Sequence, residues 1–206
     1  APDALDVPGD AKPGRFKYRD INGDRIIDAD DETFIGSPHP DFYYGLNFTA
    51  EYKGFDFTMY FQGVSGNEIF NYVKYFSHTP AFQANYSQEM LDEAGKSLPV
   101  LDNTDNYSNQ RNSWYVEDGT YFRAKNIQLG YTLNKNTVGK IGLDKVRIYV
   151  QGQNLFTVTD YSGLDPDVTV TNITEGFTQQ RDYSLGVDHG HYPIVRSFIF
   201  GINADF

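Results

Sequence analysis

The sequence predicts an all-β fold in which antiparallel strands and long loops form part of a transmembrane β-barrel. Five segments alternate between apolar and polar residues, which places successive side chains on opposite faces of a sheet. The connections between these segments are very unequal in length. The polar face carries Asn, Thr, Gln, Gly, Asp and Arg, as a wet lumen requires, while the apolar face is unbroken. We therefore expect the apolar face to meet lipid and the polar face to line the lumen.

The first two segments predict a β-hairpin. In FYYGLNFTAEY, residues 42–52, the even-numbered residues form the apolar face. In FDFTMYFQ, residues 55–62, the odd-numbered residues do so. Only Lys53 and Gly54 separate the two segments, and a two-residue connection of this kind indicates a tight hairpin turn.

The third segment, TYFRAKNIQLGYTL at residues 120–133, changes the phase of its alternation. Its apolar residues are even-numbered up to Ala124 and odd-numbered from Ile127 onward. One extra residue in a strand produces this shift, so we predict a β-bulge near Lys125-Asn126. The segments KVRIYVQGQ, residues 145–153, and SFIFGINADF, residues 197–206, alternate without such a shift.

The connections divide between two ends of the sheet if consecutive strands are antiparallel. Lys53-Gly54 and residues 134–143 are then short turns at one end. Residues 63–119 and 160–195 are long loops at the other end, together with the opening segment. Short turns on one side and long loops on the other are typical of outer-membrane barrels.

This pattern predicts two regions. Residues 1–40 form an extracellular loop with an acidic motif, and residues 41–206 form barrel strands with their extracellular loops. A soluble β-sandwich gives the same alternation. A secreted, calcium-stabilised sandwich that binds glycans is therefore the alternative, and it would differ from the barrel in being soluble without detergent.

Composition excludes several classes of function. The formal net charge of −11, from 17 basic and 28 acidic residues, does not suit a partner made of nucleic acid. Cysteine is absent, so there is neither a disulfide framework nor a thiolate site. The sequence has no Gly-x-Ser-x-Gly elbow, and its carboxylates are too scattered to nominate an acid and a base. We predict that the protein is not an enzyme.

The segment DINGDRIIDADD, residues 20–31, predicts a cation site. Oxygen-bearing side chains at loop positions one, three, five, nine and twelve, with a backbone carbonyl at seven, form a calcium site of EF-hand type. Here these residues are Asp20, Asn22, Asp24, Asp28 and Asp31, with Ile26 supplying the carbonyl. Arg25 stands where the sharp turn usually has Gly, and Asp31 replaces the bidentate Glu. We expect calcium, or magnesium, as a structural ion, and the alternative is a solvated acidic turn.

Aromatic residues of the long loops are candidates for substrate binding, because their rings can stack on sugars or on peptide side chains. They could equally pack the loop against itself or grip a partner. The six that we nominate are Tyr72, Tyr75, Phe76, Phe82, Tyr86 and Trp114. His189 and His191 could bind a transition metal with Asp188, but two histidines at this spacing on a loop are more often solvated surface.

Four stretches of the chain resemble, in the same order, the SusC/RagA-type TonB-dependent transporters of Bacteroidota. They are YRDINGDRIIDADDETFIGSPHPDFYYGLNFTAEYKGFDFTMYFQGVSGNEIFN, VEDGTYFRAKNIQLGYTL, RIYVQGQNLFTVTDYSGLDPDV and YPIVRSFIFGINADF. The resemblance implies a barrel of 22 strands in the outer membrane of a Gram-negative bacterium, filled by an N-terminal plug and covered by a SusD-like lipoprotein lid. It implies that this chain is the C-terminal part of the barrel. Arg25 departs from the Gly usual in the family's acidic loop, which bears on cation affinity.

The resemblance also implies import of oligomeric nutrients, glycans or oligopeptides, with energy supplied through TonB, which contacts a part upstream of this chain. Five strands cannot close a barrel, since the smallest outer-membrane barrels use eight. We therefore expect the first and last strands to pair with upstream barrel strands of the same transporter, because open edges in lipid leave backbone groups unpaired.

Overall fold

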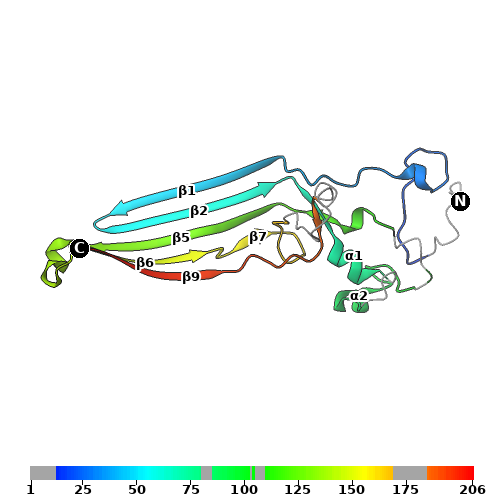
Figure 1. The fold of residues 1–206 in the computed structure, drawn as a ribbon. Helices are drawn as coiled ribbons and strands as arrows, with labels where there is room; N and C mark the ends of the chain where they lie inside the picture. Colours follow the sequence, from blue (N-terminus) through cyan, green and yellow to red (C-terminus); the bar gives the residue numbers. More distant parts are fainter. Residues whose placement is uncertain (1–12, 80–84, 103, 105–109, 169–184) are drawn as a thin grey trace, which may run out of the picture. The chain divides into compact units, whose positions relative to one another are not determined.

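The structure is a computed structural model that describes residues 13–79, 85–102, 104, 110–168 and 185–206. The chain divides into two compact units (Figure 1). The loop unit contains Ala1–Ser37, Ile69–Glu117 and Val170–Gly190. The sheet unit contains Pro38–Glu68, Asp118–Thr169 and His191–Phe206. The loop unit thus gathers most of the residues expected in the opening segment and the long loops.

The sheet unit is built on one antiparallel sheet whose long strands lie side by side (Figure 1). These strands follow the order β1-β2-β5-β6-β9, and a short strand, β7, pairs with β5 beyond the end of β6. Their bounds are β1 Phe42–Tyr52, β2 Phe55–Ser65, β5 Tyr121–Leu133, β6 Lys145–Gln153, β7 Thr157–Thr159 and β9 Ser197–Asp205. All five segments with alternating residues are therefore strands, and the antiparallel all-β prediction is confirmed.

The predicted hairpin turn is confirmed as well. Lys53 and Gly54 have φ angles of 48° and 90°, so both central residues of the turn are left-handed. Two positive φ angles in succession characterise the turn whose twist matches that of the strands it joins. Gly adopts this conformation readily, whereas Lys53 does so against its preference.

The predicted β-bulge lies where the apolar alternation changes phase. Tyr60 of β2 is opposite Asn126 of β5, and the next residue, Phe61, is opposite Ala124. Lys125 is the extra residue on β5. The bulge keeps the apolar residues on both sides of it on the same face of the sheet, which explains the phase change in the sequence.

The strand register makes the apolar face continuous across all five long strands. One row runs from Ala50 through Phe57, Leu129 and Val150 to Phe200. The neighbouring row toward the β1–β2 turn contains Tyr52, Phe55, Tyr131, Ile148 and Ile202. A register error of one residue in any strand would break both rows, so the register follows from the apolar pattern.

The opposite face of the sheet is polar and carries an ion pair that crosses a strand. Nε of Arg147, on β6, donates to Oδ1 of Asp56, on β2, at 2.9 Å. The strand between them, β5, has Gly130 at this point, and a Cβ there would lie 2.4 Å from Oδ1 of Asp56. Only a residue without a side chain leaves room for the pair.

Short helices lie where the sequence predicted only turns and loops. The connection between β5 and β6 contains α3, Lys135–Val138, and a 3₁₀ helix, η4, Gly139–Ile141. The loop unit contains η1 Ala29–Asp31, α1 Tyr72–His78, α2 Gln88–Glu93 and η3 Ser113–Tyr115. No helix in the described part of the chain is long and apolar enough to cross a membrane.

The loop unit also has a small sheet, in the order β4-β3-β8, which the sequence did not predict. These strands are β3 Glu68–Asn71, β4 Val116–Asp118 and β8 Val187–Asp188, and β8 runs parallel to β3. The buried residues of the loop unit include Ile69 on this sheet and Tyr75, Met90, Leu98 and Tyr115 around it. The loop unit therefore has an apolar core of its own.

Candidate functional site

The acidic loop at residues 20–31 is held by bonds from its own backbone to its own side chains. The carboxylate of Asp20 accepts hydrogen bonds from the amides of Gly23, at 2.6 Å, and Arg25, at 3.0 Å. Oδ1 of Asn22 accepts from the Asp24 amide at 2.8 Å. Each side chain thus fixes the backbone two to five residues ahead of it, which folds the segment into successive turns.

Asp31 closes the loop. Its carboxylate accepts from the amides of Ile21, at 2.7 Å, Asn22, at 3.4 Å, and Asp28, at 3.1 Å. The bond from the Ile21 amide, with those from Asp28 and Asn22, holds the pKa of Asp31 below its usual value. Asp28 in turn accepts from the Asp30 amide and caps η1. The first and last residues of the motif therefore bind the loop at its two ends.

Arg25 has the backbone conformation that an EF-hand loop requires at this position. Its φ angle is 74°, in the left-handed region where Gly is the usual residue. Gly23, two residues earlier, has a φ of 81°. The sharp turn expected from the oxygen spacing is thus present, and Arg25 makes it against its own steric preference.

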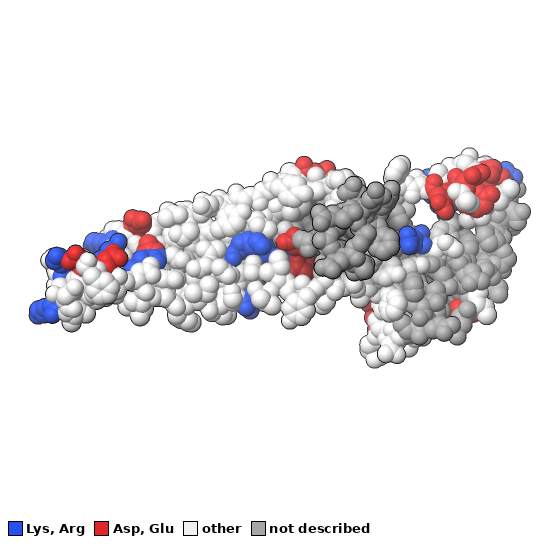
Figure 2. Space-filling view, viewed as in Figure 1, with Lys and Arg blue, Asp and Glu red and all other residues white. Residues whose placement is uncertain are grey.

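The loop's oxygens are directed at its amides rather than at one common point. Within the described residues, no group of three or more His, Asp or Glu side chains is arranged to hold a metal ion. The oxygen ligands are of the hard type that calcium prefers. Acidic side chains gather over this segment in the space-filling view, where Figure 1 draws η1 in blue (Figure 2). Calcium binding by these residues stays a prediction.

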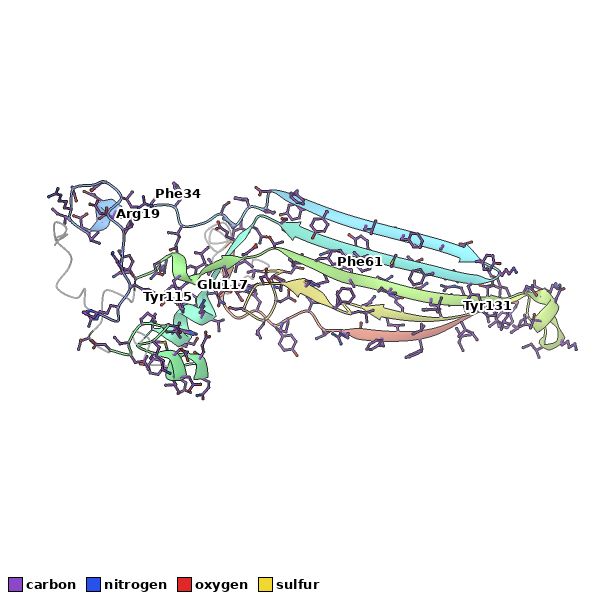
Figure 3. The ribbon with its side chains drawn as sticks, turned by 180° about the vertical axis from the view of Figure 1, so that it is seen from behind. Arg19, Phe34, Phe61, Tyr115, Glu117 and Tyr131 are labelled. Atoms are coloured by element: carbon purple, nitrogen blue, oxygen red, sulfur yellow. The ribbon has the colours of Figure 1, made fainter. Side chains whose placement is uncertain are left out.

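Large apolar side chains are exposed in the acidic loop and just after it. Phe34 is 100% exposed and Ile35 is 39% exposed. Ile26, whose carbonyl was nominated as a ligand, is also exposed. Figure 3 shows the Phe34 side chain projecting away from the backbone.

The nominated loop aromatics occupy different environments. Tyr75 is buried in the core of the loop unit, 5.0 Å from the Tyr115 ring centroid to centroid, so it packs the loop. Trp114 is half-buried, with its ring in contact with the rings of Tyr115 and Phe16. Phe76 is exposed, whereas Tyr72 and Tyr86 are half-buried. Phe82 lies outside the described residues. Cargo binding by these rings stays a prediction.

A charged cluster that the sequence did not indicate lies beside Trp114. Nζ of Lys74 lies 4.0 Å from the centroid of the Trp114 ring and 3.1 Å from Oε1 of Glu117. Nδ2 of Asn71 also donates to Glu117, at 3.4 Å. Figure 3 labels Glu117 and Tyr115 in this part of the loop unit. The cluster ties α1 to β4 and η3.

The sheet unit contains a buried ion cluster that sequence reasoning also missed. Arg123, on β5, is 1% exposed, and its guanidinium donates to Asp165, to Asp167 at 3.4 Å and to Thr157 at 2.8 Å. Asp165 is 9% exposed and accepts from the Ile194 amide at 3.0 Å. Through this cluster, the segment that follows β7 and the segment that precedes β9 are bound to β5 of the sheet.

Asp165 is ionised in this cluster. Burial alone would raise the pKa of its carboxyl, but the amides of Asp167 and Ile194 and the Arg123 guanidinium donate to it and lower its pKa below the usual value. A charge in a buried position requires such partners. The acidic run after Leu164 could have suggested an ion pair, but its partner is distant in sequence.

The two histidines of the DHGH segment belong to different units. His189 lies in the loop unit with its ring 4.8 Å from that of Tyr72, and His191 lies in the sheet unit. Asp188 is buried and accepts a hydrogen bond from the Gly190 amide at 2.8 Å. Asp188 is thus a buried structural residue, whereas His189 is exposed, with its ring near that of Tyr72.

Comparison with known proteins gives a consistent result. The chain matches no protein-family model. It is 39% identical over 205 residues to the TonB-dependent receptor P3 of Formosa agariphila, a match that covers 97% of this chain and 20% of the receptor. It is 25% identical to the TonB-dependent receptor SusC of Bacteroides thetaiotaomicron, over 95% of this chain and 18% of the receptor.

Solved structures show the same relationship. The RagAB peptide importer in its open-open state matches with a TM-score of 0.68 and 25% identity, over 87% of this chain and 19% of that chain. The closed-closed state matches with a TM-score of 0.67, over 95% of this chain and 20% of that chain. The chain thus spans about one fifth of the length of the proteins that it matches.

These relatives are receptors and transporters rather than enzymes, and proteins of this type lie in the outer membrane of Gram-negative bacteria. The resemblance found in the four quoted stretches is therefore confirmed by both sequence and fold. The chain therefore resembles, in both sequence and fold, about one fifth of a SusC/RagA-type TonB-dependent outer-membrane receptor.

Proposed function

We propose that this chain forms part of the wall and the loops of an outer-membrane importer for oligomeric nutrients, glycans or oligopeptides. The observation that carries the proposal is the continuous apolar face of the sheet. Leu46 and Phe48 on β1, and Ile202 on β9, are exposed on that face. A face of this kind needs a covering, and lipid provides one for a barrel.

Aromatic rings near both ends of the apolar face support a position in the bilayer. Toward the turns, Phe55 and Tyr131 have ring centroids 4.5 Å apart. Toward the loops, the rings of Tyr44 and Phe61 each stack with that of Phe122, at centroid distances of 6.4 Å and 5.1 Å. Figure 3 labels Tyr131 and Phe61 on neighbouring strands.

The distance between these aromatic groups is comparable with the thickness of the apolar band. Tyr44 and Tyr52 lie eight residues apart on β1, which corresponds to roughly 27 Å along the strand at about 3.4 Å per residue, or roughly 20 Å across the bilayer at the strand tilt of about 35–45° typical of such barrels. Outer-membrane barrels have an apolar band of about 25 Å between two aromatic girdles.

The soluble β-sandwich does not fit this arrangement. A sandwich needs a second sheet packed on the apolar face. Among the described residues, the five long strands all belong to one sheet, and its apolar face is exposed. The edge strands β1 and β9 would pair with further strands of the complete receptor, because unpaired backbone groups in lipid cost several kcal/mol each.

The proposed importer includes partners outside this chain. A plug would fill the lumen, TonB would supply energy through a segment elsewhere in the receptor, and a SusD-like lipoprotein would cover the loops. The similarity to the RagAB importer supports this assembly. The loop aromatics that are not buried, such as Phe76, would contact cargo or the lid.

Uptake by cells that express the complete receptor tests the proposal. Cells with and without the receptor gene would be given fluorescent oligosaccharides and fluorescent oligopeptides, with TonB present or deleted. We expect the receptor in the outer-membrane fraction and TonB-dependent uptake of one of the two cargo classes. A receptor recovered without detergent, or uptake of both classes unchanged by its deletion, would contradict the proposal.

We also propose that the acidic loop binds calcium as a structural ion. Asp20, Asn22, Asp24, Asp28 and Asp31, with the Ile26 carbonyl, would provide the ligands after their bonds to the loop's amides rearrange. Isothermal titration of calcium into the complete receptor should give one site that Asp24→Ala removes, and Asp118→Ala, outside the loop, should leave it. Equal binding by both variants would place the ion elsewhere.

A further inference from the structure

A buried histidine joins helices α1 and α2 of the loop unit. His78 is the last residue of α1 and is 7% exposed. Its Nε2 lies 3.2 Å from Oγ of Ser87, the residue that precedes α2. Its ring centroid is 5.6 Å from that of Trp114. His78 thus contacts both helices and the aromatic core at once.

The partners of His78 determine which ring nitrogen carries the proton. Nδ1 lies 2.9 Å from the Lys74 carbonyl oxygen, which can only accept a hydrogen bond. It is also 2.9 Å from Oγ of Ser77, whose own hydroxyl is directed to the same carbonyl at 3.3 Å. Nδ1 is therefore the donor, and in the neutral ring Nε2 is an acceptor.

The neutral ring completes a directional chain of hydrogen bonds across the two helices. The Ser87 hydroxyl donates to Nε2 of His78, and Oγ of Ser87 accepts from the Met90 amide at 3.0 Å. That last bond is the N-cap of α2. Met90 is fully buried, so the cap holds a core residue in place. The position of α2 is therefore coupled to the protonation state of His78.

A second partner stands beside Nε2. Oε2 of Glu89, on α2, lies 3.6 Å from it, and the Glu89 side chain is 66% exposed. A protonated ring can no longer accept from Ser87, because Nε2 becomes a donor. The Glu89 carboxylate is then the better partner. The other charged group close to the ring is Lys74 on α1, and it opposes a positive charge on His78.

We propose that His78 is a proton-dependent latch: the neutral ring binds Ser87 and fixes α2 against α1, and the protonated ring exchanges Ser87 for Glu89 and releases the cap. The latch lies in the loop unit, next to Trp114 and one turn from Tyr75. Acid would therefore loosen the segment that carries the nominated aromatics. The inference does not depend on which cargo the receptor takes.

The direction of the pH effect follows from the burial of the ring. Burial lowers the pKa of His78 below its usual value of 6.5, in spite of the bond to Lys74 and the nearby Glu89. His78 therefore binds a proton less readily in the folded segment than in the unfolded one. The contribution of the neutral ring to the stability of the folded segment is therefore complete above pH 6.5. This contribution decreases as the pH falls below 6.5, and it is lost as the pH falls through the lowered pKa of His78 in the folded segment.

Hydrogen–deuterium exchange of the complete receptor in detergent tests the latch. Protection of the amides in 85–93, corrected for intrinsic rates, would be compared at about pH 7.5 and about pH 5.5. We expect wild-type protection to fall by about three- to tenfold in acid. His78→Gln keeps an acceptor for Ser87 and does not titrate, so its protection should be equal at the two values.

Three further variants make the test specific. Ser87→Ala should show low protection at both pH values, because the cap is absent. Glu89→Gln should move the transition of the wild type to lower pH, because the protonated ring loses its partner. His39→Gln changes an exposed histidine in the sheet unit and should behave as wild type. Wild-type protection that does not change with pH, or an unchanged pH response in His78→Gln, would overturn the proposal.

Discussion

The sheet unit and the loop unit are ordered by different interactions. Backbone pairing and a period of two order the sheet, and every residue of β1 is exposed. The loop unit depends on side chains that cap the backbone: Asn71, Ser87 and Asn112 each accept from an amide at the start of a helix. The sheet is therefore ordered by its regular backbone pairing and by whatever covers its apolar face. The loop unit is ordered by individual side-chain contacts, and adjacent residues do not repeat them.

The largest effect should come from a variant that breaks the buried ion cluster of the sheet unit. Arg123→Met leaves the buried Asp165 and the half-buried Asp167 without their cation, and removal of one partner of a buried pair costs about 3–5 kcal/mol. Thermal unfolding of the complete receptor in detergent should show this loss. Arg196→Met, which changes an exposed arginine of the same unit, should cost little. Equal losses of stability in Arg123→Met and Arg196→Met would mean that the buried ion pairs of Arg123 do not stabilise the sheet unit.

A charge on the apolar face should reveal what covers the sheet. Ile148 is exposed on the row shared with Tyr131 and Ile202, and an arginine there should cost about 2–4 kcal/mol if the face meets lipid. Gln151→Arg, three residues along the same strand but on the polar face, should be tolerated. Assembly into the outer membrane and heat-dependent gel mobility would measure both. Equal tolerance would mean that water or protein covers the apolar face.

A smaller effect is expected where a single glycine permits a contact across a strand. Gly130→Ala places a Cβ against the Asp56–Arg147 pair, which must shift, at about 1–2 kcal/mol. Gly45→Ala is the matched control, because a Cβ there would lie 3.5 Å from the Tyr60 ring and 3.6 Å from the Phe61 carbonyl oxygen, which are ordinary contact distances. Unfolding of the two variants in detergent measures the difference. If Gly45→Ala is as destabilising as Gly130→Ala, loss of glycine in a strand, and not the ion pair, is the cause.

The same contrast explains what could be predicted from the sequence. The strands and the bulge at Lys125 were predictable because the side-chain period of a strand is two and is visible locally. The Arg123–Asp165 pair was not, since nothing near either residue indicates its partner. The parallel pairing of β3 with β8 joins segments more than a hundred residues apart for the same reason.

The candidate site divides in a similar way. The sharp turn at Arg25 was expected from the oxygen spacing, and its φ of 74° agrees with it. The burial of Tyr75 and the bonds of His78 depend on the tertiary packing of α1, so composition gave no sign of them. Helices α1 and α2 have seven and six residues, and helices this short are fixed by their caps and contacts rather than by a periodic pattern.

The smallest effect should come from relief of backbone strain in the acidic loop. Arg25 has a left-handed φ, which costs a residue with a Cβ about 1 kcal/mol relative to Gly. Arg25→Gly should therefore order the turn and tighten calcium binding by about two- to fivefold, which corresponds to about 0.5–1 kcal/mol. Arg19→Gly removes the same charge from an exposed residue ahead of the turn, so it separates strain from charge. Calcium titration of the complete receptor and hydrogen exchange of 20–31 without calcium would measure the two effects. Tighter calcium binding in both variants would show that the loss of positive charge is responsible. Slower hydrogen exchange in Arg25→Gly alone would show that relief of backbone strain is responsible, because only that variant changes the energy of the left-handed turn.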